Sequence, residues 1–364
     1  MKKLLYFAHG LSANGIESFL VSVMKNIDKS KYDITVITAI DEGVMCLNEK
    51  TVTDKGIRVI HAGDMDSLSK KKQYLKNIFR LMKSEHYDIV HANMDLMNGI
   101  ILFFAKICGI KKRVCHAHNS KSQYNPIGKL AFIKKNIQKI YSVLMKKLMK
   151  NSSTDFLACS GEAGNYFYGN HPYELIYNGV DIDSFRLDVP SDYMGFTEKH
   201  RVVCVGRLTM QKNPLFAVEI ANSLRKIRSD FIFIWVGVGE LESETNNRIS
   251  ELNLKDYFEL SGLRTDIPQI LNCCDLFLMP SLFEGLPVSL VEAQAAGLCC
   301  IVSDVITRQA DTGLIEYVPL ENGADFWADK ISLLLDEPKK NADNEKLKLF
   351  DIKHTVYQLE KIYG

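Results

Sequence analysis

Short apolar runs alternate along this chain with stretches whose apolar residues recur at helical spacing. Two clear amphipathic stretches, residues 71–83 and 95–108, each lie between apolar runs. A strand that is buried on both faces is apolar along its whole length, and a helix between two such strands joins them in parallel. The alternation therefore predicts an α/β chain of parallel sheets with helices on both faces.

Two series of apolar runs predict two sheets and hence two domains, which suits a length of 364 residues. The predicted strands lie at 3–8, 34–38, 57–61, 89–91, 113–116, 155–159 and 175–177, and then at 202–206, 231–236, 258–261, 276–279 and 299–302. We predict two Rossmann-like doubly wound domains over 1–185 and 186–342, with a C-terminal helix at 343–364 that packs back on the first. Tandem sheets of this kind are expected to face a central cleft, with ligands at the carboxyl ends of the strands.

Charge is distributed unevenly along the chain. Residues 1–150 hold 26 Lys and Arg against 12 Asp and Glu, while the remainder holds 19 against 32. The acidic second part would repel nucleic acid, so we expect no nucleic-acid partner. No apolar run reaches the roughly 18 residues of a membrane-spanning helix, and the N-terminus resembles a strand more than a signal peptide. Nine cysteines without framework spacing favour a reducing compartment. We therefore expect a cytoplasmic protein and leave a place at the inner face of the membrane open.

Residues 127–150 predict a basic amphipathic helix. One stripe holds the apolar residues Leu130, Ile133, Ile137, Ile140, Leu144 and Leu148, and the lysines lie mostly opposite. In one interpretation the stripe packs in the core and the lysines are solvated. In the other, the helix docks on an anionic membrane, which would suit an acceptor carried on a lipid diphosphate.

The stretch 280–293 follows an apolar run and predicts a ligand site at the start of a helix. Gly285 permits a tight turn, and Pro287 suits the first position of a helix. The amides of residues 288–289 would then be free donors at a positive helix end, which favours a phosphate. Glu284 and Glu292 could hold two hydroxylated parts of one ligand. The alternative is one capping acid and one solvated acid.

A second stretch, 202–214, places two cations after a buried strand that ends at Gly206. Arg207 offers a planar fork for phosphate oxygens, and Lys212 a mobile point charge. Asn213 is expected to cap the next helix, with Pro214 at its first position. The alternative is that both cations are ordinary surface residues.

Metal binding is not expected. Asp64-Met65-Asp66 and Asp181-Ile182-Asp183 match an acidic pattern that can hold a divalent ion, but this pattern is frequent by chance. Because cations already serve the predicted phosphate site, we predict a metal-independent protein without a cofactor.

Taken in order, these motifs resemble the retaining glycosyltransferases of the GT-B fold, in the bacterial branch of family 4 that builds capsule, exopolysaccharide and O-antigen. The resemblance covers nearly the whole chain. It is carried by 14–17, 116–120, 178–181, Gly206-Arg207 with Lys212, 237–239, Gly262, 280–281, the Glu284/Glu292 pair and 303–304.

The resemblance implies roles for these residues around a nucleotide sugar. Arg207 and Lys212 would neutralise the diphosphate, and Glu284 would bind hydroxyls of the donor sugar. His118 would reach that sugar from the first domain, and Glu292 would bind the ribose. The remaining implied donor-binding residues are Gly15, Gly206, Gly262, Arg264, Gly285, Leu286, Val288 and Ser289. Catalysis would rest mainly on electrostatic stabilisation of the leaving diphosphate.

Other residues are candidates for the acceptor side or depart from the family pattern. Glu17 and His116 are expected to face the acceptor, and His9 is a weaker candidate. Glu17 could equally be a first-turn helix acid, and His118 or His116 a satisfied histidine at a strand end. Gln309 stands where relatives often have an acid, which puts the loop chemistry in doubt.

The resemblance implies a transferase that moves a hexose or N-acetylhexosamine from a nucleotide diphosphate sugar, expected to be UDP-linked, to a hydroxyl of a glycan. The acceptor would be lipid-linked, in the biosynthesis of a cell-surface polysaccharide. Two alternatives remain open at this point. One is a nucleotide-sugar epimerase, which would turn over the donor without an acceptor. The other is a glycan-binding protein on a transferase frame.

Overall fold

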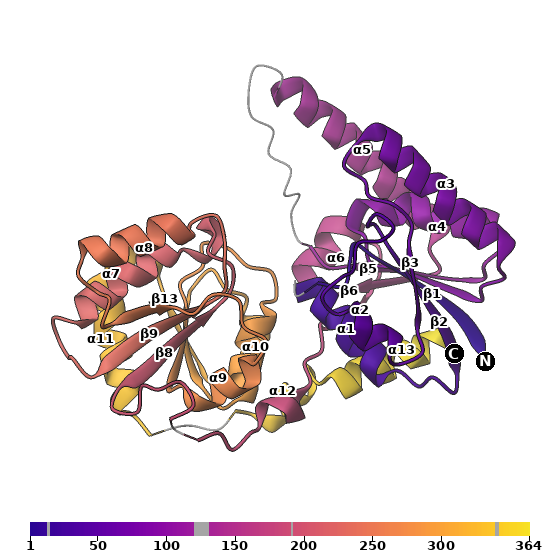
Figure 1. The fold of residues 1–364 in the computed structure, drawn as a ribbon. Coiled ribbons are helices and arrows are strands. Elements are labelled where there is room, and N and C mark those ends of the chain that lie inside the picture. Colours follow the sequence, from indigo (N-terminus) through magenta and orange to yellow (C-terminus); the bar gives the residue numbers. More distant parts are fainter. Residues whose placement is uncertain (13–14, 120–130, 191, 339–341) are drawn as a thin grey trace. The chain divides into compact units, whose positions relative to one another are not determined.

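The computed structural model describes residues 1–12, 15–119, 131–190, 192–338 and 342–364. The chain divides into two compact units (Figure 1). One contains residues 1–179 together with 352–364, and the other contains residues 180–351. We expected the first domain to end at residue 185, slightly later than this division.

The first unit is built on a parallel seven-stranded sheet of order β3-β2-β1-β4-β5-β6-β7. Its strands are β1 (Lys2–Ala8), β2 (Tyr32–Thr38), β3 (Arg58–His61), β4 (Ile89–Ala92), β5 (Lys112–Ala117), β6 (Asp155–Ala158) and β7 (Glu174–Leu175). Its helices are α1 (Gly15–Asn26), α2 (Glu49–Thr53), α3 (Leu68–Ser84), η1 (Asp95–Met97), α4 (Asn98–Ile107), α5 (Ala131–Ser152), α6 (Gly161–Tyr168) and α13 (Ile352–Tyr363).

Alternation along β1 shows how the helices cover both faces of this sheet. Leu4 and Tyr6 belong to the core shared with α1, α2 and α13. Leu5 and Phe7 point to the opposite core, which is shared with α3, α4, α5 and α6. Because β1 is central and buried on both faces from Leu4 onward, it is apolar without a break from Leu4 to Ala8.

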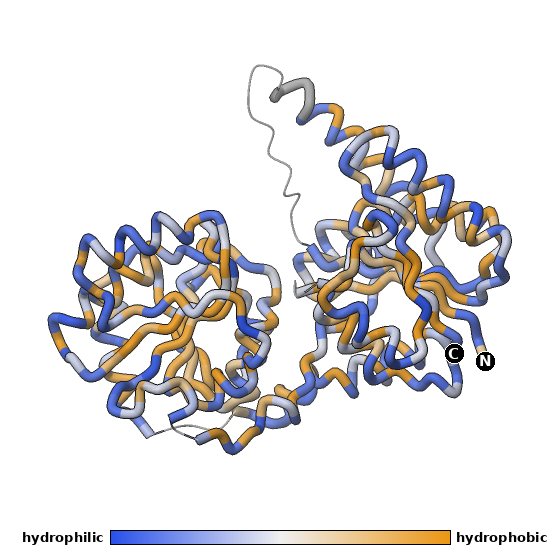
Figure 2. The backbone as a smooth tube through the Cα atoms, in the orientation of Figure 1, coloured by the Kyte–Doolittle hydropathy of each residue, from blue (hydrophilic) through white to orange (hydrophobic). Residues whose placement is uncertain are grey.

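The second unit has a parallel six-stranded sheet of order β10-β9-β8-β11-β12-β13. Its strands are β8 (His200–Val205), β9 (Phe231–Val236), β10 (Phe258–Leu260), β11 (Leu276–Met279), β12 (Cys299–Ser303) and β13 (Ile315–Val318). Its helices are η2 (Ile182–Phe185), η3 (Met210–Lys212), α7 (Pro214–Leu224), α8 (Glu242–Glu251), α9 (Ile267–Cys273), α10 (Val288–Ala295), η4 (Arg308–Ala310), η5 (Leu320–Asn322), α11 (Gly323–Asp336) and α12 (Asn344–Lys348). In Figure 2 the strands at the centre of both units are coloured mostly as hydrophobic, whereas the helices alternate between hydrophobic and hydrophilic residues.

The prediction of two parallel-sheet Rossmann-like domains is confirmed, with two corrections of detail. Strand β13 was missed because its sequence, Ile-Glu-Tyr-Val, is a half-buried edge strand without a continuous apolar run. The single helix expected at 343–364 is two helices, α12 and α13. The second of these returns to the first unit, and Gly179 is packed against its first residue, Ile352.

Helix α5 does not pack its predicted apolar stripe in the core, which was one of the two interpretations of this helix. Ile137, Ile140 and Leu144 are all more than half exposed, as is Val143. The helix instead contacts the core through Met145 and Met149, which lie on a neighbouring face of the helix. Residues 127–130 of the predicted helix lie outside the described part of the chain. Within the described ranges, no helix combines the length and the apolar character that crossing a bilayer requires.

Candidate active site

The loops that follow β8 and β11 lie together at the carboxyl edge of the second sheet, because these two strands are neighbours. The Leu282 amide donates to the Gln211 carbonyl at 2.8 Å, and Gln211 Nε2 donates to the Phe283 carbonyl at 3.1 Å. Asn213 Nδ2 donates to the Pro280 carbonyl at 3.2 Å. The side chain of Asn213 therefore ties the loops together and does not cap α7 as expected. Sequence reasoning gave Gln211 no role here.

Two predicted site residues, Lys212 and Glu284, form an ion pair across these loops. Lys212 Nζ lies 2.7 Å from Glu284 Oε1, and the side chains are only 18% and 8% exposed. The pair is not aligned as a hydrogen bond, and Oε1 has no hydrogen-bond partner among the described residues. An anionic ligand would therefore compete with Glu284 for Lys212, which would free the carboxylate for a ligand hydroxyl.

Glycines let the Lys212 stem and the loop backbones approach each other. A Cβ atom at Gly206 would lie 2.9 Å from Lys212 Cε, because the stem crosses this glycine. A Cβ atom at Gly237 would lie 2.2 Å from the Gly206 carbonyl oxygen, which also accepts from Trp235 Nε1 at 2.8 Å. The Lys212 stem can therefore take this path because Gly206, after β8, and Gly237, after β9, have no side chains that would block it.

The two predicted arginines differ in availability. The side chain of Arg207 is exposed and has no hydrogen bond or ion pair within the described part of the chain. Arg264 instead grips Asp266 with Nε and Nη2, at 2.8 and 2.5 Å, and this holds the pKa of the Asp266 carboxyl well below its ordinary range. Arg207 is thus free for a phosphate, whereas only the backbone near Gly262 and Arg264 is free to meet a base.

Helix α10 begins at Val288, with Pro287 in the capping position just before it. Among the described residues, nothing accepts from the amides of Val288 and Ser289. Gly285 has open space where a side chain would stand, and Leu286 is buried and anchors the loop. A helix end of this kind favours an anion.

Glu292 lies in the second turn of α10 and is desolvated without compensation. Burial raises the pKa of its carboxyl to about 7. No donor or cation contacts the Glu292 carboxyl among the described residues. A buried carboxyl without a partner destabilises a fold, and such groups cluster at functional sites.

His118 lies at the carboxyl end of β5 in the first unit, with an asparagine side chain beside each ring nitrogen. Nε2 lies 2.9 Å from Asn93 Oδ1, and Nδ1 lies 3.2 Å from Asn178 Oδ1. Burial lowers the pKa of the imidazole to about 4, so the ring is neutral at pH 7. Its contact with a donor sugar stays a prediction.

His116 and Glu17 are engaged in internal contacts. His116 is fully buried, and its Nδ1 lies 3.2 Å from Nε2 of His91, whose other nitrogen meets the Tyr363 hydroxyl at 2.5 Å. Glu17 is buried as well and accepts hydrogen bonds from the amide, at 2.8 Å, and the hydroxyl of Ser12. It therefore braces the loop before α1, which begins at Gly15. Contact of either side chain with an acceptor remains a prediction.

Asp95 is a residue that sequence reasoning missed. It follows β4, has a left-handed backbone (φ +50°) and accepts from Asn119 Nδ2 at 2.6 Å. Burial raises the pKa of its carboxyl. Its position in the sequence was the signal that could have found it. Asp95 comes shortly after the end of β4, just as His118 comes directly after the end of β5.

The acidic D-x-D patterns do not gather further metal ligands. Asp64 is paired with Lys70. Among the described residues, no group of three or more His, Cys, Asp or Glu side chains could hold a metal ion. Gln309, the departure from the family pattern, is exposed on η4.

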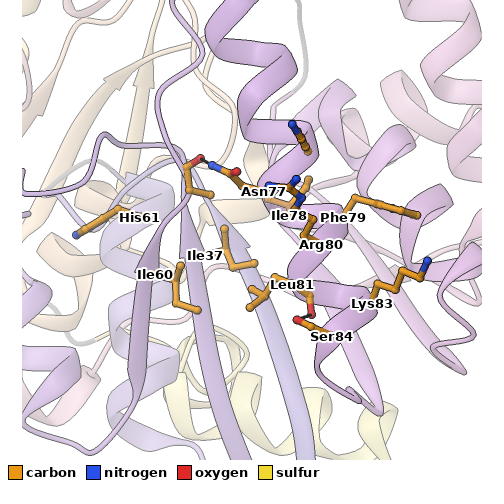
Figure 3. Close-up of a pocket in the computed structure, with 12 residues that line it drawn as sticks. Ile37, Ile60, His61, Asn77, Ile78, Phe79, Arg80, Leu81, Lys83 and Ser84 are labelled. Carbon is orange, nitrogen blue, oxygen red and sulfur yellow. Dashed lines mark hydrogen bonds between the residues drawn. The ribbon is translucent and has the colours of Figure 1, made fainter.

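A groove of about 750 Å³ lies in the first unit between α3 and strands β2 and β3 (Figure 3). Ile37, Ile60 and Leu81 supply much of its apolar lining. None of the predicted site residues lines it. It therefore adds nothing to the assignment of the donor site.

Two glycosyltransferase profiles match this chain, one in each unit. The profile described as Glycosyltransferase Family 4 matches residues 13–184, and the one described as Glycosyl transferases group 1 matches residues 199–337. A putative glycosyltransferase, EpsF of Bacillus subtilis, is 27% identical over 100% of this chain and 96% of its own. An Escherichia coli UDP-Gal:alpha-D-GlcNAc-diphosphoundecaprenol alpha-1,3-galactosyltransferase is 26% identical over 94% of each chain.

Solved structures show the same fold. The crystal structure of Anabaena HepE in complex with UDP and glucose superposes with a TM-score of 0.78 over 99% of both chains, at 18% identity. The GT-B fold predicted from the sequence is thereby confirmed. With the profile matches covering most of both units, the chain belongs to the family 4 (group 1) glycosyltransferases.

Proposed function

We propose that this protein is a retaining, metal-independent transferase that uses a UDP-sugar. It would move a hexose or N-acetylhexosamine to a hydroxyl of a lipid-linked glycan during cell-surface polysaccharide biosynthesis. The observation that carries the proposal is the grouping of a free arginine, the Lys212–Glu284 ion pair, free amides and the unpartnered carboxyl of Glu292 at one edge of the second sheet. The name of the Escherichia coli relative, with a UDP-galactose donor and a diphosphoundecaprenol acceptor, supports the substrate classes. Retention rests on the family resemblance.

The charges at this edge suit a diphosphate that becomes a leaving group. Arg207 and Lys212 would balance the phosphates, and the free amides at the start of α10 would add two neutral donors. When Lys212 turns from Glu284 to phosphate, the carboxylate Oε1 becomes available to sugar hydroxyls. Donors fixed in place before the reaction stabilise the departing charge without reorganisation.

Glu292 suits the ribose of the same nucleotide. Its carboxyl is desolvated and has no partner, so two ribose hydroxyls would supply the hydrogen bonds it lacks. Binding would thus repay part of the cost of burying this acid. The pairing of a cationic loop with a ribose-binding acid favours nucleotide diphosphates over simple sugar phosphates.

A thermal-shift panel of UDP, GDP and ADP, with and without EDTA, tests the donor site. We expect UDP to raise the melting temperature, EDTA to leave the shift unchanged, and Arg207→Ala to remove most of it. Lys255→Ala is the matched control, since Lys255 is an exposed cation of the same unit. At 100 times the dissociation constant the stabilisation should reach ~2.7 kcal/mol. No shift with any nucleotide would overturn the donor site, and loss with EDTA would overturn metal independence.

Product analysis tests the reaction itself. Proton NMR of the first product formed should show the anomeric configuration of the donor. An inverted product would refute retention and leave the transferase intact. Turnover of the donor sugar to an isomer without an acceptor would instead support the epimerase alternative.

We further propose that helix α5 rests on an anionic membrane surface. Ile137, Ile140, Val143 and Leu144 are 53–63% exposed on adjacent turns. Helices α3, α4 and α5 form one layer, and their sequences contain many lysines and no acidic residue. Exposed apolar side chains among cations favour the interface of an anionic bilayer, at ~1 kcal/mol per cation near the surface.

Vesicle sedimentation tests this surface. The protein should bind vesicles rich in phosphatidylglycerol and not vesicles of phosphatidylcholine alone. Ile140→Asp with Leu144→Asp should abolish binding, whereas Leu333→Asp should not, because Leu333 is equally exposed (63%) on α11 of the other unit. Equal binding to both vesicle types would refute the proposal.

A further inference from the structure

Polar side chains gather at the carboxyl ends of β1, β4 and β5 in the first unit. Asn93 and Asp95 follow β4, and His118 and Asn119 follow β5. Hydrogen bonds join these residues in two pairs, Asn119 with Asp95 at 2.6 Å and Asn93 with His118 at 2.9 Å. Ligands of open α/β sheets bind outside this edge, so the pairs stand where a ligand is expected.

Asp95 differs from its neighbours because the described residues provide a hydrogen bond to only one oxygen of its carboxylate. Asn119 supplies one hydrogen bond, to Oδ2, and Oδ1 has no partner among the described residues. No lysine or arginine pairs with the carboxylate in the described part of the chain, and His9, after β1, lies close enough to act on its charge. The thiols of Cys115 and Cys159 lie close enough to be influenced by its charge.

The backbone at Asp95 is also strained. Its φ of +50° is a left-handed conformation that few non-glycine residues adopt, although Asp and Asn tolerate it best. Such strain costs about 1–3 kcal/mol and tends to persist at binding and catalytic sites. The side chain nevertheless keeps part of its surface exposed, and His9 beside it is exposed. A carboxylate held in this way is poised for a ligand and contributes little to the core.

We propose that Asp95 binds the acceptor glycan by accepting a hydrogen bond from one of its sugar hydroxyls. The inference rests on the proposed transferase function and adds an acceptor-binding residue to it. A carboxylate that lacks a cation would repel the diphosphate of a lipid-linked acceptor, so Asp95 is assigned to the sugar. Its open oxygen accepts hydrogen bonds only, which selects a hydroxyl or amide N–H of the glycan.

The test compares Asp95→Asn with Asp88→Asn, using a short-chain lipid-diphosphate N-acetylglucosamine as the probe. Asparagine tolerates the left-handed backbone and can still accept from Asn119, so the fold should hold. Asp88 is a matched control, because it lies just before β4 at the opposite edge of the sheet and accepts from the Lys3 amide at 2.8 Å.

We expect Asp95→Asn to raise the KM for the probe ~10-fold or more, as the loss of a hydrogen bond to a charged group implies. Hydrolysis of the donor without acceptor and the thermal shift with UDP should stay as in the unaltered protein. Asp88→Asn should change none of these. An unchanged KM, or an equal loss of donor hydrolysis, would overturn the assignment.

Direct binding of the same probe, measured by calorimetry, separates this proposal from the proposed function. If the protein binds the probe but transfers no sugar, the transferase proposal fails. A weaker affinity in Asp95→Asn would then still support Asp95 as a glycan contact. Equal affinity in both proteins, or no binding to the unaltered protein, would overturn it.

Discussion

Replacing Glu292 by Gln should stabilise the second unit at alkaline pH while it removes nucleotide binding. Burial raises the pKa of this carboxyl from 4.5 to about 7. The native state therefore holds the proton more tightly than the unfolded chain, and native stability falls as pH rises from about 4.5 through 7. At ~1.4 kcal/mol per tenfold change in proton affinity, this gap corresponds to about 3 kcal/mol. Since the side chain keeps some contact with solvent, we expect about 2 kcal/mol.

Urea unfolding followed by tryptophan fluorescence measures the free energy of unfolding of the second unit, which contains Glu292. The chain has two tryptophans, Trp235 and Trp327, and both are buried in the second unit. Glu292→Gln should match the unaltered protein at pH 4.5 and exceed it by about 2 kcal/mol at pH 8.5. Glu321→Gln, at an exposed position of the same unit, should differ at neither pH. A gain that is the same at both pH values, or absent at pH 8.5, would refute a desolvated carboxyl at this site.

Three further substitutions follow from close contacts. Gly206→Ala should push the Lys212 stem aside and raise the donor KM ~10-fold or more. It should also destabilise the second unit by ~1 kcal/mol or more, because the backbone at Gly206 (φ +158°) is one that residues with a side chain rarely adopt. Gly99→Ala should destabilise the first unit by ~2 kcal/mol or more in urea unfolding, because its Cβ atom would lie 2.5 Å from the Met145 carbonyl oxygen. Tyr363→Phe should cost ~1–3 kcal/mol and raise amide exchange in α13, because the buried hydroxyl joins two buried partners.

Each of these has an outcome that would contradict its reasoning. Gly206→Ala with an unchanged donor KM would mean that Lys212 does not need its observed path. Wild-type stability in Gly99→Ala would mean that α4 and α5 separate easily. Unchanged amide exchange in Tyr363→Phe would mean that the hydroxyl contributes nothing to the docking of α13.

The sequence determined the strands well where burial on both faces made them apolar. Phe231–Val236 and Leu276–Met279 were predicted with the observed bounds, since each is a central run enclosed by helices. Strand β13 could not be predicted in this way, because an edge strand is only half-buried and its polar residues interrupt the pattern. The return of α13 to the first unit was predicted as well, although periodicity shows only that this segment is helical and not where it packs.

The donor-site residues could be proposed from local motifs, but their pairings could not. Lys212 and Glu284 are far apart in sequence, and their ion pair depends on β8 and β11 being neighbours in the sheet. The hydrogen bonds from Arg264 to Asp266 could not be predicted either, because they depend on the side-chain rotamers of both residues. Asp95 has no motif, and its left-handed backbone becomes visible only when the chain is folded.

The path of α13 has a consequence for the order in which this protein matures on the ribosome. Ile352, Val356 and Leu359 fill the core against β1 and α1, yet they are translated after every residue of the second unit. The second unit can therefore finish folding during synthesis, while the first waits with part of an apolar sheet face uncovered. Nascent chains at that stage should be the species most prone to aggregation and most dependent on chaperones.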